Sequence, residues 1–188
     1  MFNLASKLVV VSGPAGVGKD TVVAKLLEID ESFSLSVSAT TRAPRGTEQH
    51  GVNYYYFSTD EFTKMIDNDE FIEYAKYGAN YYGTLKSDVE NRIAQGKTVI
   101  LVIEVKGAAN IKKLYPESLS IFVMPPSEEV LEARLRGRQT ECEADIIKRL
   151  DIARSEMKES VNYDFIIVNN ELEKAVDDAY KIIKNHTK

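Results

Sequence analysis

The sequence predicts an α/β protein in which a central parallel sheet lies between two layers of helices. Short runs of β-branched and apolar residues recur along the chain without alternating polar residues, which is typical of strands buried on both faces. Segments with the helical spacing of apolar residues separate these runs. Strands that alternate with helices in this way pair in parallel, because each helix carries the chain back across the sheet.

The core elements follow one another in a regular order. The predicted parallel strands are Lys7–Ser12, Thr98–Val105, Leu119–Met124 and Asp164–Val168. The predicted helices are Thr21–Ile29, Lys86–Ala94, Ser127–Leu135, Ala144–Met157 and Glu171–Ile183.

Two stretches interrupt this order. The first, Phe33–Thr84, is rich in tyrosine, and short strands are expected in it around Tyr54–Phe57 and Phe71–Lys76. We interpret it as an inserted substrate-binding lobe. The second, RLRGRQTECEAD, is dense in arginine and acidic residues and lies between two predicted helices, so we interpret it as a mobile lid. The expected single domain, 1–188, has a core at about 1–34, 85–136 and 151–188, the lobe at about 35–84 and the lid at about 137–150.

The composition excludes several classes of protein. A chain of 188 residues fits one domain with a sizeable core, and 44% hydrophobic with 28% charged residues is an ordinary globular balance. The net charge of -5 argues against general nucleic-acid binding. The apolar run near the N-terminus is too short to span a membrane. A lone Cys142 and two histidines offer neither a disulfide framework nor a zinc site, which favours a reducing cytoplasm.

A glycine-rich turn between the first strand and the first helix predicts a phosphate-binding loop. Glycines let successive backbone N–H groups point at phosphate oxygens, and the lysine adds a mobile positive charge. The expected ATP-binding residues of this turn are Gly13, Pro14, Ala15, Gly16, Val17, Gly18, Lys19, Asp20 and Thr21.

One position of this loop departs from the usual pattern. The residue after the lysine is normally Ser or Thr, which reaches Mg²⁺, whereas Asp20 stands here and Thr21 follows. Asp20 could bind Mg²⁺ directly or through water, or could simply favour the positive end of the helix. Both interpretations stay open, and Asp20 is the one candidate metal ligand.

A stiff loop in the inserted lobe carries two arginines. Arg42 and Arg45 flank Pro44, and two guanidinium groups so placed can bind one dianionic phosphate. The alternative is a solvated basic loop. Tyr54 and Tyr82 can add neutral hydroxyl donors, although tyrosines of this lobe also serve as packing residues.

Several separate motifs resemble those of guanylate kinases, over almost the whole chain. They are SGPAGVGKDT, SVSATTRAPRGTEQHGVNYYYF, NDEFIEYAKYGANYYGT, IFVMPPSEEVLEARLRGR, EADIIKRL and YDFIIVNNELEKA. The resemblance implies a three-layer P-loop kinase fold with an inserted GMP-binding lobe and a short lid. It also implies transfer of the γ-phosphoryl group of ATP to GMP, with Mg²⁺ as cofactor.

The resemblance assigns a role to individual residues. In the GMP site, Arg42, Arg45, Tyr54 and Tyr82 would hold the 5′-phosphate, while Glu73 would accept the N1 and N2 hydrogens of guanine, with Ser38, Thr84 and Glu104 nearby. Adenine lacks that pair of donors, so a buried Glu73 would reject AMP. The lid arginines Arg134, Arg138 and Arg149 would join Lys19 and Arg42 in the transfer, and Asn169 would lie near the adenine of ATP.

Each of these roles has an alternative. Glu73 could be the solvent face of a strand, and the lid arginines could pair with Glu128, Glu132 and Glu141 on a helical surface. The chain also departs from the family segment VILVIEVKGAAN: its first acidic position is Val102 and the usual glutamine is Lys106. These departures bear on the metal more than on GMP.

Two other functions fit parts of the sequence. A kinase for a ribose bisphosphate would share the fold and can carry Asp after the loop lysine. A guanylate-kinase-like binding module without turnover would fit Val102, but it would have little use for Lys19 and the arginines. Glu73 and its neighbours favour a base-bearing acceptor. The expected partners are therefore ATP and GMP, without nucleic acid or membrane, and the chain is expected to be a monomer or a homodimer.

Overall fold

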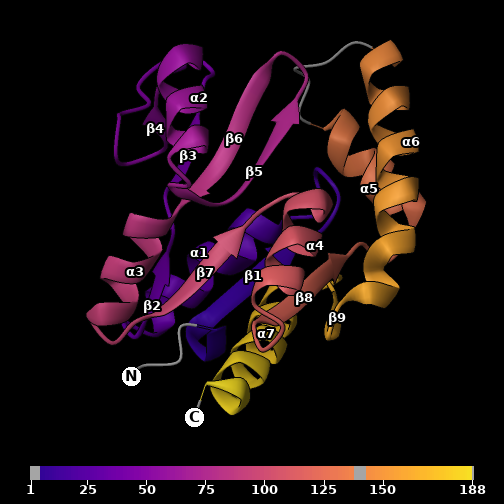
Figure 1. Cartoon of the computed structure of the whole chain (residues 1–188). Coiled ribbons are helices and arrows are strands. Elements are labelled where there is room, and N and C mark those ends of the chain that lie inside the picture. The colour runs from indigo at the N-terminus through magenta and orange to yellow at the C-terminus, as the bar shows by residue number, and fades with distance from the viewer. Residues whose placement is uncertain (1–4, 138–142, 188) are drawn as a thin grey trace.

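The computed structural model describes residues 5–137 and 143–187, and its central layer is a parallel sheet (Figure 1). The strands are β1 (Leu8–Ser12), β2 (Phe33–Leu35), β7 (Thr98–Val102), β8 (Leu119–Met124) and β9 (Phe165–Val168). They lie in the order β2-β7-β1-β8-β9, and every neighbouring pair is parallel. The predicted α/β class with a parallel sheet is thus confirmed.

Helices cover both faces of this sheet. Their bounds are α1 (Lys19–Ile29), α3 (Lys86–Ala94), α4 (Val105–Leu114), α5 (Glu128–Arg136), α6 (Glu143–Lys158) and α7 (Leu172–His186), with short 3-10 turns at Ala5–Lys7 and Glu159–Asn162. Successive residues of β1 enter different cores. Val9 and Val11 pack with residues of α1, α5, α6 and α7, whereas Leu8 and Val10 pack with residues of α3 and α4. This alternation produces the three layers.

A second, smaller sheet lies beside the carboxyl end of the first (Figure 1). Its strands are β3 (Ser38–Thr40), β4 (Tyr55–Tyr56), β5 (Phe71–Tyr77) and β6 (Asn80–Leu85), in the order β4-β3-β6-β5. Helix α2 (Thr59–Asp67) packs on it through Phe62, whose ring stacks on Phe71 with centroids 4.3 Å apart. Phe62 is fully buried, so this sheet has a hydrophobic core of its own.

The structure differs from the prediction in two segments that border the smaller sheet and its cavity. Strand β7 ends at Val102 rather than Val105, because Glu104 takes the N-cap position of α4 and the chain turns there into the helix. Residues Phe33–Leu35, which begin the stretch predicted to interrupt the alternation of strands and helices, form the edge strand β2 of the parallel sheet. The reason is burial: Phe33 is 5% exposed and its ring lies against Tyr180 of α7.

Within residues 5–137 and 143–187, none of the helices is both long and apolar enough to cross a membrane.

Candidate active site

The loop between β1 and α1 has the geometry of a phosphate cradle. Gly18 adopts a φ of 93°, in the left-handed region that glycine tolerates best, and a Cβ atom on it would lie 2.6 Å from Nδ2 of Asn169. Lys19 is the first residue of α1. The N–H groups of this first helical turn have no partner within the helix, so the loop presents a positive end to an anion.

Two side chains from the other end of the sequence hold this loop. The buried Asn169 donates from Nδ2 to the carbonyl of Val17 over 2.9 Å. Arg134 of α5 donates to the same carbonyl over 3.1 Å and to the carbonyl of Asn169 over 3.0 Å. Arg134 is thus bound to backbone around the loop and does not pair with the acidic side chains of its own helix.

A cavity of about 850 Å³ opens from the loop toward the smaller sheet. Lys19 and Asp20 line it on the loop side, and Ile152 and Glu156 line it from α6. The other predicted site residues on its wall are Ser38, Tyr54, Glu73, Tyr82 and Glu104, together with the departing positions Val102 and Lys106. The fold therefore brings the loop lysine and most of the predicted acceptor residues to one space.

Glu73 is a buried carboxyl on the wall of this cavity. It is 8% exposed, and the hydroxyl of Thr84 donates to its Oε1 atom over 2.8 Å. Burial raises the pKa of Glu73 to about 7, against a smaller lowering by the Thr84 hydrogen bond. The other oxygen, Oε2, faces Gly107 of α4, where the absence of a side chain leaves room for it. The alternative that Glu73 lies on a solvent face of its strand is wrong.

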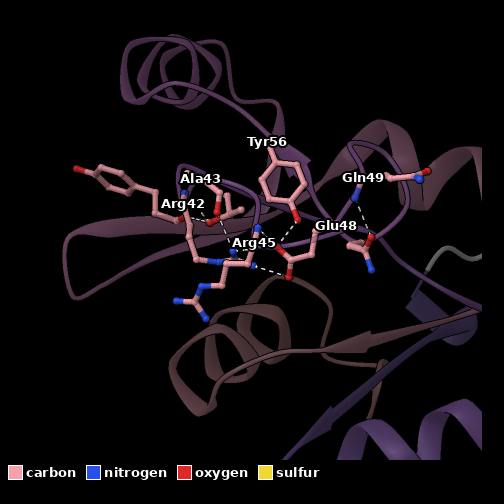
Figure 2. Close-up of polar contacts among 9 residues, drawn as sticks. Arg42, Ala43, Arg45, Glu48, Gln49 and Tyr56 are labelled. Carbon is pink, nitrogen blue, oxygen red and sulfur yellow. Dashed lines mark hydrogen bonds and ion pairs between the residues drawn. The ribbon is translucent and has the colours of Figure 1, made fainter. Parts of the chain in front are cut away.

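The two predicted phosphate arginines differ in their surroundings (Figure 2). Arg42 is 11% exposed at its side chain, forms a two-bond ion pair with Glu48 and lies over the ring of Tyr54, 5.2 Å from its centroid. Tyr54 in turn lies against Tyr82, with ring centroids 6.3 Å apart. Arg45 is exposed on the same loop. The alternative of a solvated basic loop therefore does not hold for Arg42.

Glu156 is a functional candidate that the sequence analysis missed. Burial and the neighbouring charge of Glu104 raise the pKa of Glu156 to about 7, while Lys19 acts in the opposite direction. Two neighbouring carboxyls such as those of Glu104 and Glu156 favour sharing a proton or binding a cation. Ile152 and Glu156 share one face of α6 at i and i+4, and Glu159, three residues further on, begins the 3-10 turn that follows the helix; all three line the cavity. That spacing is a signal in the sequence, although it does not reveal what the face meets.

The carboxylates around the loop suit a magnesium ion that takes most of its ligands from water and substrate phosphates. Asp20, Glu104 and Glu156 line the cavity near Lys19, whereas Val102 offers no oxygen ligand. No group of three or more His, Cys, Asp or Glu side chains able to hold a metal occurs in residues 5–137 and 143–187. Mg²⁺ usually keeps several waters and takes one or two carboxylates plus substrate phosphates, so these residues fit an ion that arrives with a nucleotide.

The predicted lid residues are placed in part. Arg149 is half-buried in α6. Arg136, which is not one of the predicted lid arginines, pairs with Glu132 over 2.8 Å. This is the kind of ion pair on a helical surface that the alternative interpretation expected. Arg138 and Cys142 lie outside the described residues.

Comparisons with known proteins identify the family of the chain. The sequence model of the family described as "Guanylate kinase" matches residues 5–186. The chain is 47% identical over 185 residues to the guanylate kinase of Prochlorococcus marinus subsp. pastoris, covering 98% of this chain and 100% of that one. It is 46% identical over 181 residues to the guanylate kinase of Fusobacterium nucleatum subsp. nucleatum, with 96% and 97% covered.

A solved structure gives the same result. The guanylate kinase of Anaplasma phagocytophilum superposes with a TM-score of 0.76 at 34% identity, over 96% of this chain and 85% of that chain. The family model spans both the phosphate loop and the cavity wall that carries Glu73. The chain therefore belongs to the guanylate kinase family.

Proposed function

We propose that this chain transfers the γ-phosphoryl group of ATP to GMP, giving ADP and GDP. The observation that carries the proposal is the buried carboxyl of Glu73 on the wall of a cavity that Lys19 also lines. One end of this cavity suits a triphosphate and the other suits a base with paired hydrogen-bond donors. Membership of the guanylate kinase family supports both assignments.

ATP occupies the loop side in this proposal. The N–H groups of Ala15, Gly16 and Gly18 and the N-terminus of α1 face its phosphates, and Lys19 and Thr21 follow at the start of the helix. Asn169 and Arg134 fix the carbonyl of Val17 and so keep the loop in shape. The adenine lies toward Asn169, and Arg138 and Arg149 act on the phosphates from the lid.

GMP occupies the side of the smaller sheet. The ionised Glu73 accepts the N1 and N2 hydrogens of guanine, and Ser38 and Glu104 complete the wall around the ring. The buried Thr84 supports the ring contact by donating its hydroxyl to Glu73. Arg42, Arg45, Tyr54 and Tyr82 bind the 5′-phosphate, for which arginine supplies bidentate hydrogen bonds. AMP would bring a base without the matching donors and would leave the Glu73 carboxylate unpaired.

Phosphoryl transfer then depends on position and charge. Little covalent chemistry is needed from side chains in a loose transition state, so alignment of the two phosphates and compensation of their negative charge supply most of the rate. Lys19, Arg42, Arg134 and Arg149 are the described cations that the proposal assigns to this task. Closure of the two lobes over the bound nucleotides would keep out water that would otherwise hydrolyse ATP.

Magnesium is the proposed cofactor. Asp20 and Glu104 would hold it together with phosphate oxygens and water, with Glu156 beside them. When bound, the ion would supply compensation for the phosphate charge. Val102 removes one acidic position, so Asp20 takes over part of that role in the proposal.

The two alternative functions are less well supported. A ribose bisphosphate has no base, so it would leave the buried carboxyl of Glu73 with Thr84 as its donor and no bond from the acceptor. A binding module without turnover would not need the bonds that hold the phosphate loop in shape. The curated relatives compared above are guanylate kinases, which favours the GMP kinase.

ADP formation in a coupled assay tests the proposal. ATP and Mg²⁺ are supplied with GMP, dGMP, AMP or a ribose bisphosphate, and Lys19→Met serves as the inactive control. GMP should be the best acceptor. A preference for the ribose bisphosphate, or binding of GMP without turnover, would overturn the proposal. The domain limits, a cytoplasmic location and a monomeric or homodimeric state stay predictions.

A further inference from the structure

The carboxylate of Glu48 lies at the centre of a hydrogen-bonded cluster in the loop between β3 and β4 (Figure 2). It accepts bonds from Nη1 and Nη2 of Arg42 over 2.9 and 3.0 Å. Its Oε2 atom also accepts the backbone N–H of Arg45 over 2.8 Å and the hydroxyl of Tyr56 over 2.9 Å. One carboxylate therefore joins both predicted phosphate arginines to a strand of the smaller sheet.

These bonds fix which donors of Arg42 are used. A guanidinium group has five N–H donors in one plane. Nη1 donates to Glu48 and to the carbonyl of Ala43, the latter over 2.8 Å, and Nη2 donates once to Glu48. Within the part of the chain that the structure describes, Nε–H and the second Nη2–H have no acceptor. Those two donors lie along the same edge of the plane and form a fork.

The aromatic rings around Arg42 fix the plane as well. The guanidinium carbon lies 5.2 Å from the ring centroid of Tyr54 and 5.9 Å from that of Tyr56. The two rings restrain the guanidinium group of Arg42 through cation–π contacts, while Glu48 restrains its Nη1 and Nη2 atoms through hydrogen bonds. Rotation of the side chain is thus opposed from three directions, and the edge with the unused fork keeps a defined orientation.

We propose that Glu48 is a positioning residue for the acceptor phosphate: it holds the end of Arg42 so that the Nε–Nη2 edge binds the phosphate as a ready fork. This inference rests on the proposed function. A planar edge with two parallel donors matches two oxygens of a phosphate. Because Glu48 orders Arg42 before the ligand arrives, less side-chain freedom is lost on binding.

The pKa of Glu48 is consistent with a permanent ion pair. The hydrogen bonds from Arg42, followed by the N–H of Arg45, lower it to about 2. The carboxylate therefore stays charged at any pH where the enzyme is assayed. Glu48 also offsets one of the two positive charges of the loop, which limits binding of unrelated anions.

The test compares binding of GMP with binding of guanosine, which lacks the phosphate. Isothermal titration of Glu48→Gln should show GMP affinity reduced about tenfold or more, since a charge-assisted fork is lost, with guanosine affinity unchanged. Gln keeps the size of Glu but turns an NH₂ group toward a donor. Glu70→Gln, which changes an exposed carboxylate just before strand β5 of the same lobe, is the matched control and should leave both ligands unaffected.

A double-mutant cycle separates positioning from general support of the loop. In an Arg42→Ala background, Glu48→Gln should cost little further GMP affinity, because Glu48 acts through Arg42. Equal losses for GMP and guanosine, or additive losses in the cycle, would overturn the inference. Should Glu48→Gln lower the melting temperature markedly, Glu48→Asp and Tyr56→Phe replace it under the same criteria. A wild-type protein that binds no GMP would instead overturn the proposed function itself.

Discussion

The Oε2 atom of Glu73 lies 2.6 Å from the point that a Cβ atom on Gly107 would occupy. The two residues come from β5 and α4, so the smaller sheet and the main core meet at the predicted base-binding carboxyl. Gly107 sits inside a helix, where glycine normally costs stability relative to alanine. Its presence there gives the carboxyl of Glu73 the space it occupies.

Gly107→Ala should therefore damage recognition of GMP and spare the fold. The added methyl meets the end of a flexible side chain, so Glu73 shifts while the backbone stays in place. We expect KM for GMP to rise about tenfold or more, as for a displaced hydrogen-bonding group, with KM for ATP unchanged. Steady-state kinetics with Asn110→Ala, an exposed change in the same helix, provide the comparison. An unchanged KM for GMP would show that Glu73 does not contact the base.

Glu73→Gln should stabilise the protein at alkaline pH. The folded-state pKa of about 7 lies above the ordinary glutamate pKa of 4.5, so the contribution of Glu73 to stability is complete below pH 4.5 and is lost as the pH rises through 7. An ionised buried carboxylate is then a cost of roughly 1–3 kcal/mol that glutamine avoids. Urea unfolding should find the variant more stable at pH 8 and nearly equal to wild type at pH 5. Identical differences at both pH values would contradict a raised pKa.

The same pKa predicts how GMP binding depends on pH. Only the ionised Glu73 accepts both guanine donors, so KM for GMP should rise as the pH falls below about 7. Glu156 titrates in the same range, which makes Glu156→Gln the necessary control. The dependence should persist in Glu156→Gln and be absent from whatever binding Glu73→Gln retains. If it vanished in Glu156→Gln instead, the titration would belong to the carboxyl pair beside Lys19.

Asp20→Ala tests the unusual residue of the phosphate loop. If Asp20 helps to hold magnesium, the Mg²⁺ concentration that gives half the maximal rate should rise several-fold, with KM for GMP little changed. Asp20 is exposed, and its replacement leaves the loop glycines in place, so the fold should be retained. If the magnesium dependence were unchanged, the role of Asp20 would be that of a favourable negative charge at the N-terminus of α1.

Asn169→Ala tests the anchor of that loop. The buried amide donates to the carbonyl of Val17, so its removal should lower the free energy of unfolding by about 1–2 kcal/mol and raise KM for ATP. Arg134 still binds the same carbonyl, which limits the loss. Asn170→Ala, at the exposed neighbouring position, should change neither quantity in urea unfolding and kinetics. Equal effects of the two substitutions would contradict the anchoring role.

Local patterns account for the parts of the fold that the sequence predicts. Helix α3 has its predicted bounds, Lys86–Ala94, and β8 its predicted bounds, Leu119–Met124, because both have clear periodicity. Helix α2 was missed although Ser58 and Glu61 form a capping box before it, a signal that can be read from the letters. Strand β2 is three residues long, and its place depends on a neighbouring strand far along the chain.

The residues of the candidate site also fall into two groups, those that could be named from the sequence and those that depend on the folded chain. The phosphate loop depends on consecutive residues, so its residues could be named from the sequence. The space beside Glu73 depends on Gly107, and the orientation of Arg42 depends on Glu48 across a loop. Neither relationship follows from spacing, because both need the path of the chain in three dimensions. Glu156 was missed for that reason too: its helix meets Glu104 and Lys19 only in the folded protein.

The ratio of kcat/KM for GMP to kcat/KM for AMP tests the central claim most directly. For the wild type we predict a ratio of about 10³ or more, since AMP leaves a buried carboxylate unpaired. In Glu73→Gln the ratio should fall steeply through loss of GMP turnover, while AMP turnover stays low. A wild-type ratio near one, or a ratio that Glu73→Gln leaves unchanged, would contradict the assignment of Glu73 as the residue that selects guanine.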